Sequence, residues 1–414
     1  MSDNLQNKKH SFVNCVLHRE PYANTIINII NNDKALTANN SFVIALDSPW
    51  GTGKTTFIKM LKSKIDNEYK NIHTVMYNAW ENDYCENPFE PLFYDIIDND
   101  VFRPEINKKN RTKLISCARK LPKALVKDFI EKTSGNNTLN VVNEVEDSIK
   151  VALRKSPPFI KRLKEERQAK IDFKECLLKT AETLKDEKLL IIIDELDRCK
   201  PLFAIKTLEI IKHLFDVHNI TFLLSIDFSQ LRHSISTVYG QNMDSEGYLR
   251  RFVNYVLKLP EPNKDNYISY LIKEKPLTVI YANKAKISDN VVTQLTIDLK
   301  NILVWDILSL RDINVIYENF RMFCNSRVNI SDYDDYQRHI MGELLPCLVL
   351  MTFKYKNTDL YDAVIRADER CIDKVLGQIG APNPFTVYLC DPKKTFLKKA
   401  REYAREIEMF MSYA

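Results

Sequence analysis

A glycine-containing turn is the first segment whose residue types suit one particular chemistry. Its residues are Ser48, Pro49, Trp50, Gly51, Thr52, Gly53, Lys54, Thr55 and Thr56. Glycine allows positive φ angles, so several backbone N–H groups can converge on one phosphate. A lysine adds a point charge, and the hydroxyl that follows it is a magnesium ligand. The turn therefore predicts a site for ATP and Mg²⁺, with Lys54 on the β and γ phosphates and Thr55 on the metal.

Ser48 departs from the general pattern G-x-x-x-x-G-K-[ST], which has glycine at this first position. Gly51 lies in the same turn and can supply the missing backbone freedom. The alternative interpretation is an ordinary glycine turn with a solvated lysine. The turn lies between a strand-like and a helix-like run, and this context favours the phosphate site.

A second candidate site is the acidic end of the segment 189–197, which reads LLIIIDELD. A carboxylate after a buried apolar run is costly unless positive charge lies beside it, and Mg²⁺ would supply that charge. We expect Asp194 to hold the metal through water. We expect Glu195 to orient and polarise the water that attacks the γ-phosphate. The alternative is that Glu195 and Asp197 cap a helix that begins near Pro201.

Four further side chains are candidates to complete such a site. Asp227 follows the apolar run 220–226 and contacts either the γ-phosphate or the water, or else caps the next helix. Arg250 and Arg251 are candidates for an arginine finger that reaches a neighbouring subunit, or for a solvated or acid-paired helix face. Arg311 is a candidate nucleotide sensor at the start of a lid helix, with an intrahelical ion pair as the alternative.

Other catalytic chemistries have no support in the residue pattern. No histidine lies in a Ser-His-Asp or H-E-x-x-H arrangement, which excludes those hydrolase and zinc sites. The nine cysteines include no C-x-x-C pair and no His–Cys cluster at metal-ligand spacing. We therefore expect reduced thiols, several of them in the core.

The elements that must position these residues are strands and helices in alternation. Short apolar runs predict strands over 41–47, 73–78, 188–193 and 220–226. Apolar periodicity predicts helices over 55–65, 172–184, 201–217 and 228–235, and a lead-in helix face at Tyr22, Ile26, Ile27 and Ile30. This alternation is typical of an α/β fold with a parallel sheet. In folds of this kind, ligands bind at the carboxyl ends of the strands. Asn78-Ala79-Trp80 lies at one of these strand ends.

Charge and periodicity divide the chain into four expected regions. Residues 1–97 and 173–264 form the two parts of the core, 98–172 form a helical insertion, and 265–414 form a helical lid and C-terminal helical region. Within 103–174 there are 19 Lys and Arg against 9 Asp and Glu, a local charge of +10. The whole chain carries +5, so the remainder is net acidic. The helical patterns of the last region fall over 290–330 and 333–410.

Composition is ordinary for a soluble protein, and we expect a location in the cytoplasm. The start of the chain has no apolar signal core, and no run reaches the ~20 apolar residues of a membrane helix. The nearest, Leu344–Phe353, contains Pro346 and predicts a buried helix. A net charge of +5 is too mild to indicate nucleic-acid binding by itself.

Taken together, the motifs resemble those of the KAP family of P-loop NTPases over about residues 16–330. The matching segments are Trp50–Thr55, Asn78–Trp80, Asp194–Cys199, Leu224–Leu231 and Tyr248–Pro260. The resemblance implies an α/β parallel-sheet P-loop NTPase core with a basic helical insertion and a C-terminal helical lid or bundle. Many members have transmembrane helices where this chain has the basic insertion, and bacterial members are often tied to defence against phage and plasmids.

Two functions compete on these grounds. The first is an oligomeric regulatory or motor ATPase, a homo-oligomer with a partner protein as effector or sensor. The alternative is a nucleotide-stabilised binding module whose basic insertion docks nucleic acid or an acidic protein. A third interpretation, a small-molecule kinase, lacks any sign of an acceptor pocket.

Overall fold

The computed structural model describes residues 11–32, 41–98, 104–121, 157–184, 187–276, 299–304, 307–326 and 345–366, with the single residues 297, 404 and 407. The chain forms two compact units. The first contains Arg19–Pro49 and Lys54–Pro260. The second contains Glu261 onward, together with Asn14–His18 and the tip of the phosphate turn, Trp50–Gly53.

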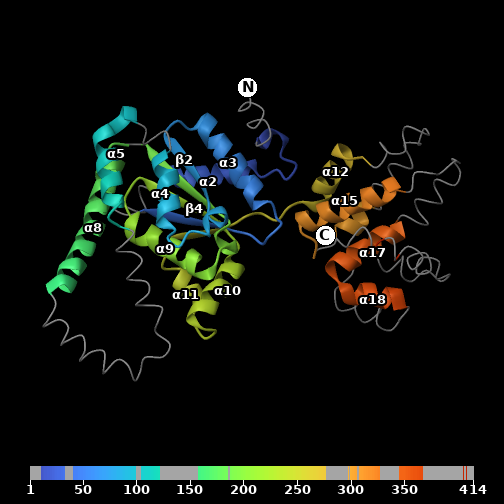
Figure 1. Ribbon diagram of the computed structural model, residues 1–414. Coiled ribbons are helices and arrows are strands. Elements are labelled where there is room, and N and C mark those ends of the chain that lie inside the picture. The colour runs from blue at the N-terminus through green and yellow to red at the C-terminus, as the bar shows by residue number, and fades with distance from the viewer. Residues whose placement is uncertain are drawn as a thin grey trace, which may run out of the picture. The chain divides into compact units, whose positions relative to one another are not determined.

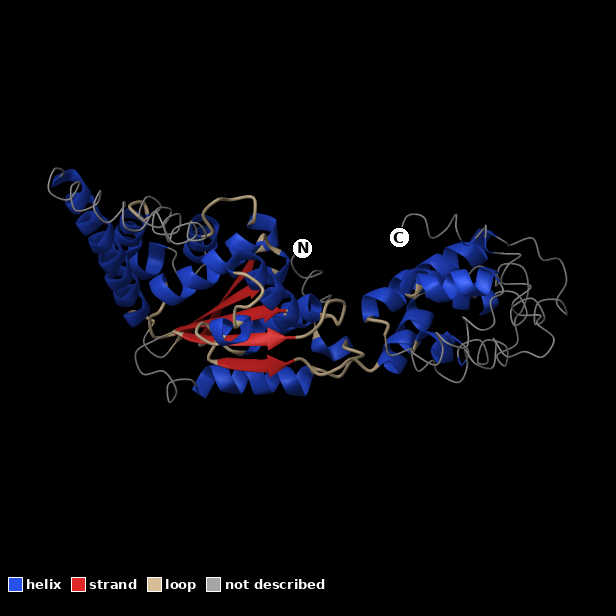
Figure 2. Cartoon of the chain, turned by 90° about the horizontal axis from the view of Figure 1, so that it is seen from below, coloured by secondary structure: helices blue, strands red, loops and turns tan. Residues whose placement is uncertain are grey.

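A five-stranded parallel sheet in the order β2-β3-β4-β1-β5 forms the centre of the first unit (Figure 2). Its strands are β1 (Phe42–Asp47), β2 (Ile72–Asn78), β3 (Lys188–Asp194), β4 (Ile220–Ile226) and β5 (Tyr255–Lys258). The register pairs Asn78 with Asp194, Asp194 with Ser225, and Asp47 with Ile226. Because every pair is parallel, the carboxyl ends of the strands lie at one edge. The four expected strands and the α/β fold class are confirmed.

Strand β5 was not predicted from the sequence. It pairs with β1 at the edge of the sheet and is only four residues long. Tyr255 and Val256 are about half exposed, and the apolar run Tyr255–Leu257 is shorter than the run that marks a buried strand. The Tyr22 hydroxyl donates to the carbonyl of Lys258 (2.6 Å), and an Arg19 N–H donates to that of Pro260 (2.7 Å).

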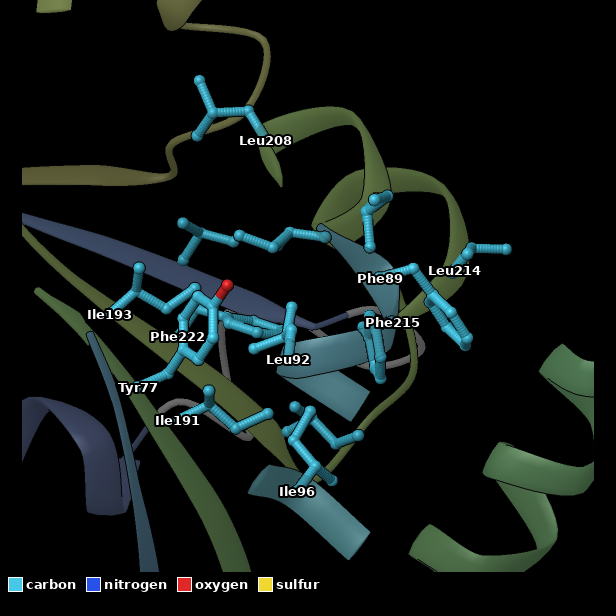
Figure 3. Close-up of a cluster of buried hydrophobic side chains, with 14 of the residues drawn as sticks. Tyr77, Phe89, Leu92, Ile96, Ile191, Ile193, Leu208, Leu214, Phe215 and Phe222 are labelled. Atoms are coloured by element: carbon cyan, nitrogen blue, oxygen red, sulfur yellow. The ribbon is translucent and has the colours of Figure 1, made fainter. Parts of the chain in front are cut away.

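Helices cover both sides of this sheet (Figure 2). They are α2 (Glu20–Asn32), α3 (Lys54–Glu68), α4 (Phe89–Asp98), α9 (Pro201–Leu214), α10 (Phe228–Tyr239) and the short α11 (Ser245–Leu249), with 3-10 turns η1 (Phe12–Asn14), η3 (Trp80–Asn82) and η5 (Leu196–Arg198). The apolar faces predicted for α2 and α3 are buried, apart from a half-buried Tyr22. Aromatic and aliphatic side chains from β2, β3, β4, α4 and α9 pack into one core (Figure 3). This core holds the carboxyl edge in place.

The insertion contains two long helices, α5 (Pro104–Ala118) and α8 (Pro157–Glu182), which lie side by side (Figure 1). Helix α8 runs unbroken through the boundary that we expected after residue 172, so one helix belongs to both regions. The stretch 122–156 of the insertion lies outside the described residues.

From Glu261 onward, the elements that the structure describes are helices. They are α12 (Lys264–Glu274), α15 (Leu310–Ser326), α17 (Leu345–Lys356) and α18 (Thr358–Arg366). Helix α17 is the buried helix expected around Pro346, and its residues 347–351 are fully buried. The chain is not helical at 308–309, so the helical pattern over 290–330 is interrupted before α15. Among the described helices, none is both long and apolar enough to cross a membrane.

Candidate functional site

The phosphate turn joins the end of β1 to the start of α3. Gly51 and Gly53 have φ angles of 80° and 90°, the region that favours glycine. Ser48 is buried, and its N–H donates to the carbonyl of Ile226 (3.2 Å). Ser48 is not among the described non-glycine residues with positive φ, so serine is tolerated where the general pattern has glycine.

Lys54 points back into the turn that it follows. Its side chain is buried, and Nζ donates to the carbonyls of Ser48 and Pro49. Burial lowers the pKa of the ammonium, while nearby carboxylates act in the opposite direction. These carboxylates belong to Asp197, Asp227, Asp194 and Asp47. The charge therefore lies inside the turn, among acids at the strand ends.

Asp194 and Thr55 come from different elements and meet at this edge. Asp194 is 2% exposed at the end of β3, and its carboxyl lies close to the hydroxyls of Ser225 and Thr55. Burial raises the pKa of the Asp194 carboxyl, and the nearby hydroxyls and the N–H of Glu195 only partly oppose this effect. A hydroxyl and a carboxylate in contact are hard oxygen donors of the kind that Mg²⁺ prefers.

Glu195 has a strained backbone and a fixed carboxylate. Its φ of 62° is left-handed, and its N–H donates to Asp194 Oδ1 (3.0 Å). Oε1 pairs with Arg198 Nη1 (2.8 Å), and Oε2 accepts from Asn78 Nδ2 (3.2 Å). Arg198 also lies over the Trp80 ring, 5.6 Å from its centroid. The carboxylate therefore has a defined direction before any substrate binds.

Asn78 and Arg198 are site residues that the sequence analysis did not assign. Asn78 pairs with Asp194 in the sheet register, and Arg198 lies three residues after Glu195 in η5. The Asn-Ala-Trp strand end marked Asn78 as lying near the edge. Contact with Glu195 depends on the pairing of β2 with β3 and on the 3-10 turn.

Asp227, Asp197 and Asp47 organise the turn from β4 into α10. The Asp227 side chain accepts from the N–H groups of Ser229 and Gln230, as the helix-cap alternative predicted. Asp197 Oδ2 accepts from Asp227 N (3.0 Å), and Asp47 Oδ1 accepts from the N–H of the residue after Asp227 (2.9 Å).

The alternative cap role of Asp197 is wrong. The helix at Pro201 has Lys200 as its N-cap and no side-chain cap bond. Asp197 is instead buried beside β4, where it binds the backbone of Asp227. It thus helps to fix the β4–α10 turn.

The two candidate finger residues lie on the surface. Arg250 is the C-cap of α11 and pairs with Glu246 (2.6 Å), with 73% of its side chain exposed. Arg251 is exposed beside it. Exposure suits a finger that reaches another subunit, and the pairing of Arg250 with Glu246 also fits the alternative of a solvated or acid-paired helix face.

Arg311 lies in the first turn of α15, within the second unit. Its backbone N–H donates to the carbonyl of Gly51 (3.3 Å), and its side chain is exposed. Ser309 fills the space beside Gly51, since a Cβ built at Gly51 would lie 2.8 Å from the Ser309 Cβ. The tip of the phosphate turn is therefore in contact with the N-terminus of α15.

A reciprocal cap stabilises this helix start. Ser309 N donates to Asp312 Oδ2 (2.7 Å), and Asp312 N donates to Ser309 Oγ (3.2 Å). Lys356 pairs with the same carboxylate (2.6 Å). Burial tends to raise the pKa of Asp312, but the bonds from Lys356 and Ser309 outweigh it and hold the pKa below its usual value.

Comparison with solved structures gives weak likenesses. The chain is similar to the Aeropyrum pernix ORC2 protein in its ADPNP–ADP complexes, with 14% identity, a TM-score of 0.37, and 96% of this chain and 95% of that chain covered. It is similar to domain III of the Thermotoga maritima replication initiation protein DnaA, with 12% identity, a TM-score of 0.32, and coverage of 82% and 97%. These scores are too low to support a conclusion. No curated protein matches the chain.

The family comparison covers most of the chain. The model for the KAP family P-loop domain matches residues 19–327. That range includes the phosphate turn, the acidic end of β3 and the insertion between them. The chain belongs to the KAP family of P-loop NTPases and is therefore a nucleoside triphosphate hydrolase.

Proposed function

We propose that the chain hydrolyses ATP in a magnesium-dependent reaction at the phosphate turn. The observation that carries this proposal is the contact of Thr55, in the first turn of α3, with Asp194 at the end of β3. Mg²⁺ typically takes one or two carboxylates and completes its shell with phosphate oxygens and water. The buried carboxylate fits such an ion, because its burial is costly without a cation beside it.

The chain's own groups account for nucleotide binding. Lys54 binds the β and γ phosphates, and the free N–H groups at the start of α3 bind phosphate oxygens. Gly51 and Gly53 turn further N–H groups inward through their positive φ. Asp194 and Thr55 would hold Mg²⁺, which when bound neutralises charge on the phosphates.

Glu195 is our candidate for the residue that orients the attacking water. Arg198 and Asn78 each contact one of its two oxygens, which leaves further lone pairs to accept from water. A water bound there lies beside the metal ligand, because Glu195 N–H is bonded to Asp194. Positioning of this kind is the main protein contribution to phosphoryl transfer.

The test is phosphate release with ATP and Mg²⁺, with nucleotide binding measured separately. We expect Lys54→Ala to lose binding and turnover, and Glu195→Gln to keep binding and lose turnover. Glu187→Gln is the matched control, because Glu187 precedes β3 at the opposite end of that strand, where it pairs with His73.

Two outcomes would contradict the proposal. One is a wild-type chain that binds ATP and shows no turnover with Mg²⁺. The other is a loss with Glu187→Gln as large as that with Glu195→Gln, because a general loss of stability would then explain both.

We further propose that the ATPase acts as a homo-oligomer, with Arg250 or Arg251 completing a neighbour's site. The exposure of both arginines supports this proposal. A partner protein as effector or sensor, and a role in defence against phage or plasmids, rest on the family resemblance. We propose that Asp227 acts near the γ-phosphate. Arg311 is the proposed nucleotide sensor.

The second candidate function is a nucleotide-stabilised binding module. The observation that favours it is the local charge of +10 over 103–174, from 19 basic against 9 acidic residues. Reversing the charge of Lys108, Lys109 and Arg111 should abolish a gel shift with nucleic acid and flatten its salt dependence. No shift at low salt with the wild-type chain would remove nucleic acid as the partner.

A further inference from the structure

Two cysteines far apart in the sequence meet between the helices of the insertion. Cys117 lies in the last turn of α5, and Cys176 lies in α8, 59 residues later. Their sulfur atoms are 3.5 Å apart. Both cysteines are half-buried, so they lie at the margin of the packed interface.

The helices around this pair are held together by a buried apolar contact. Leu114, Ala118 and Leu121 from the α5 side, and Phe173 and Leu177 from α8, belong to one buried cluster. These residues flank the two cysteines in sequence. The sulfur contact is therefore set by the packing of two helices and does not depend on the orientation of a loose side chain.

Little movement separates this contact from a covalent bond. A disulfide has an S–S length of about 2.05 Å, so the sulfurs must approach by about 1.5 Å. Cys117 lies one residue before the end of α5. The chain turns there through two backbone hydrogen bonds, from Lys120 N to Cys117 O (3.1 Å) and from Leu121 N to Ala118 O (3.0 Å). A helix end adjusts at lower cost than a helix centre.

We propose that Cys117 and Cys176 form a reversible disulfide site whose oxidant is a hydroperoxide. The site fastens the end of α5 to α8. Because α8 leads into β3, the bond joins the insertion to the element that carries Asp194.

The chemistry balances with one peroxide for each pair. The Cys176 thiolate attacks a peroxide oxygen, which gives a sulfenic acid and releases water after proton uptake. The Cys117 sulfur then attacks the sulfenic sulfur, the S–S bond forms, and hydroxide leaves and takes the Cys117 proton as a second water. Two thiols and H₂O₂ thus give one disulfide and two waters, and a dithiol reductant reverses the reaction.

The surroundings of Cys117 favour its protonated form. Burial, and then the hydrogen bond with Cys176, raises the pKa of the Cys117 thiol to about 11. A thiol that keeps its proton at neutral pH suits the second step, so the proposal gives Cys117 the resolving role and Cys176 the first attack.

The experiment uses the full reduced chain with hydrogen peroxide as the probe. After treatment, free thiols are alkylated in denaturant and the protein is digested without reductant for mass spectrometry. We expect a peptide pair linked through Cys117 and Cys176, which dithiothreitol separates. Cys117→Ser and Cys176→Ser should each lose the link, whereas the control Cys347→Ser, at a buried cysteine, should keep it.

Recovery of both peptides with alkylated thiols would overturn the proposal. So would a sulfinic or mixed-disulfide product on one cysteine in place of the link. Peroxide treatment in guanidinium is the internal control, because pairing that depends on the fold must there spread among the nine cysteines. Hydrogen exchange over 111–118 adds a readout that needs no variant. It should slow on oxidation, and an unchanged rate would contradict the fastening of α5.

Discussion

At the residue scale, the position of the Glu195 carboxylate depends on two neighbours that are not themselves acids or bases in the reaction. Asn78 and Arg198 each contact one of its oxygens, and Trp80 lies beneath Arg198. Glu195 itself holds a left-handed backbone, which costs energy for a residue with a side chain. A strained backbone of this kind persists when neighbouring groups hold the residue in place, as Asn78 and Arg198 do for Glu195.

The first prediction concerns these positioning residues. We expect Asn78→Ala and Arg198→Gln to lower kcat by up to about 100-fold, because a misplacement of about 1 Å costs that much. ATP affinity should stay unchanged, since neither side chain touches the phosphate turn in our assignment. Asn71→Ala, at the opposite end of β2, is the matched control. Equal effects in Asn71→Ala, or a change in affinity alone, would contradict the prediction.

The second prediction concerns the buried charge of Asp194. Its pKa is raised, so the ionised form destabilises the fold at pH values above that pKa, and the penalty disappears as the carboxyl is protonated at lower pH. Asp194→Asn should therefore abolish hydrolysis and raise the Tm of the nucleotide-free chain at neutral pH by a few degrees.

Thermal unfolding of both proteins across pH checks this prediction. The gap in Tm should be widest at neutral pH and close as pH falls through the raised pKa. A lower Tm for Asp194→Asn than for the wild type at neutral pH would contradict the prediction. It would show that neighbouring groups stabilise the Asp194 carboxylate even without a ligand.

At the element scale, the start of α15 is built to hold one position. Ser309 and Asp312 cap the helix reciprocally, and Lys356 of α17 pairs with the same carboxylate. This fixed helix start leaves no room for a side chain on Gly51. Two separate constraints thus select glycine there, the contact with Ser309 and the φ of 80°.

The third prediction separates these two constraints. Gly51→Ala should weaken ATP binding, measured by nucleotide titration. Adding Ser309→Gly should restore binding in part, because it removes the clash and costs only a few tenths of a kcal/mol as an N-cap change. A residual deficit of about 1–2 kcal/mol should remain from the left-handed φ. Full recovery, or no recovery, would contradict this division. Ser309→Gly alone is the control.

At the scale of the whole molecule, an arginine finger requires that one chain completes the site of another. The two finger candidates are exposed directly after α11, and Arg250 shares Glu246 with Arg232 of α10. An exposed ion pair of this type contributes little stability, so a change in activity on mutation would reflect function.

The fourth prediction is a mixing experiment. The finger variant, Arg250→Ala or Arg251→Ala, should lose about 1,000-fold or more in kcat. Mixed with Glu195→Gln, it should regain activity above the sum of the two variants measured apart, because the Gln variant supplies the missing arginine. Arg232→Ala is the control and should stay active. Simple additivity of the two inactive variants would exclude a finger in trans.

Much of this protein follows from its sequence alone. The phosphate turn, four of the five strands and the buried faces of α2 and α3 were predicted because glycine φ preference, apolar runs and helical periodicity are local properties. The acids after β3 were predicted as a site for a similar reason, since a carboxylate after a buried strand needs a positive partner.

The tertiary structure decided the features that join distant residues. The short exposed strand β5 forms because β1 offers it an edge, and its own apolar run is too short to predict a strand. Asn78 reaches Glu195 through the register of β2 on β3, and Ser309 reaches Gly51 through the start of α15. The two thiols meet through the packing of α5 on α8. These contacts depend on packing between segments far apart in the chain, on which local periodicity and spacing carry no information.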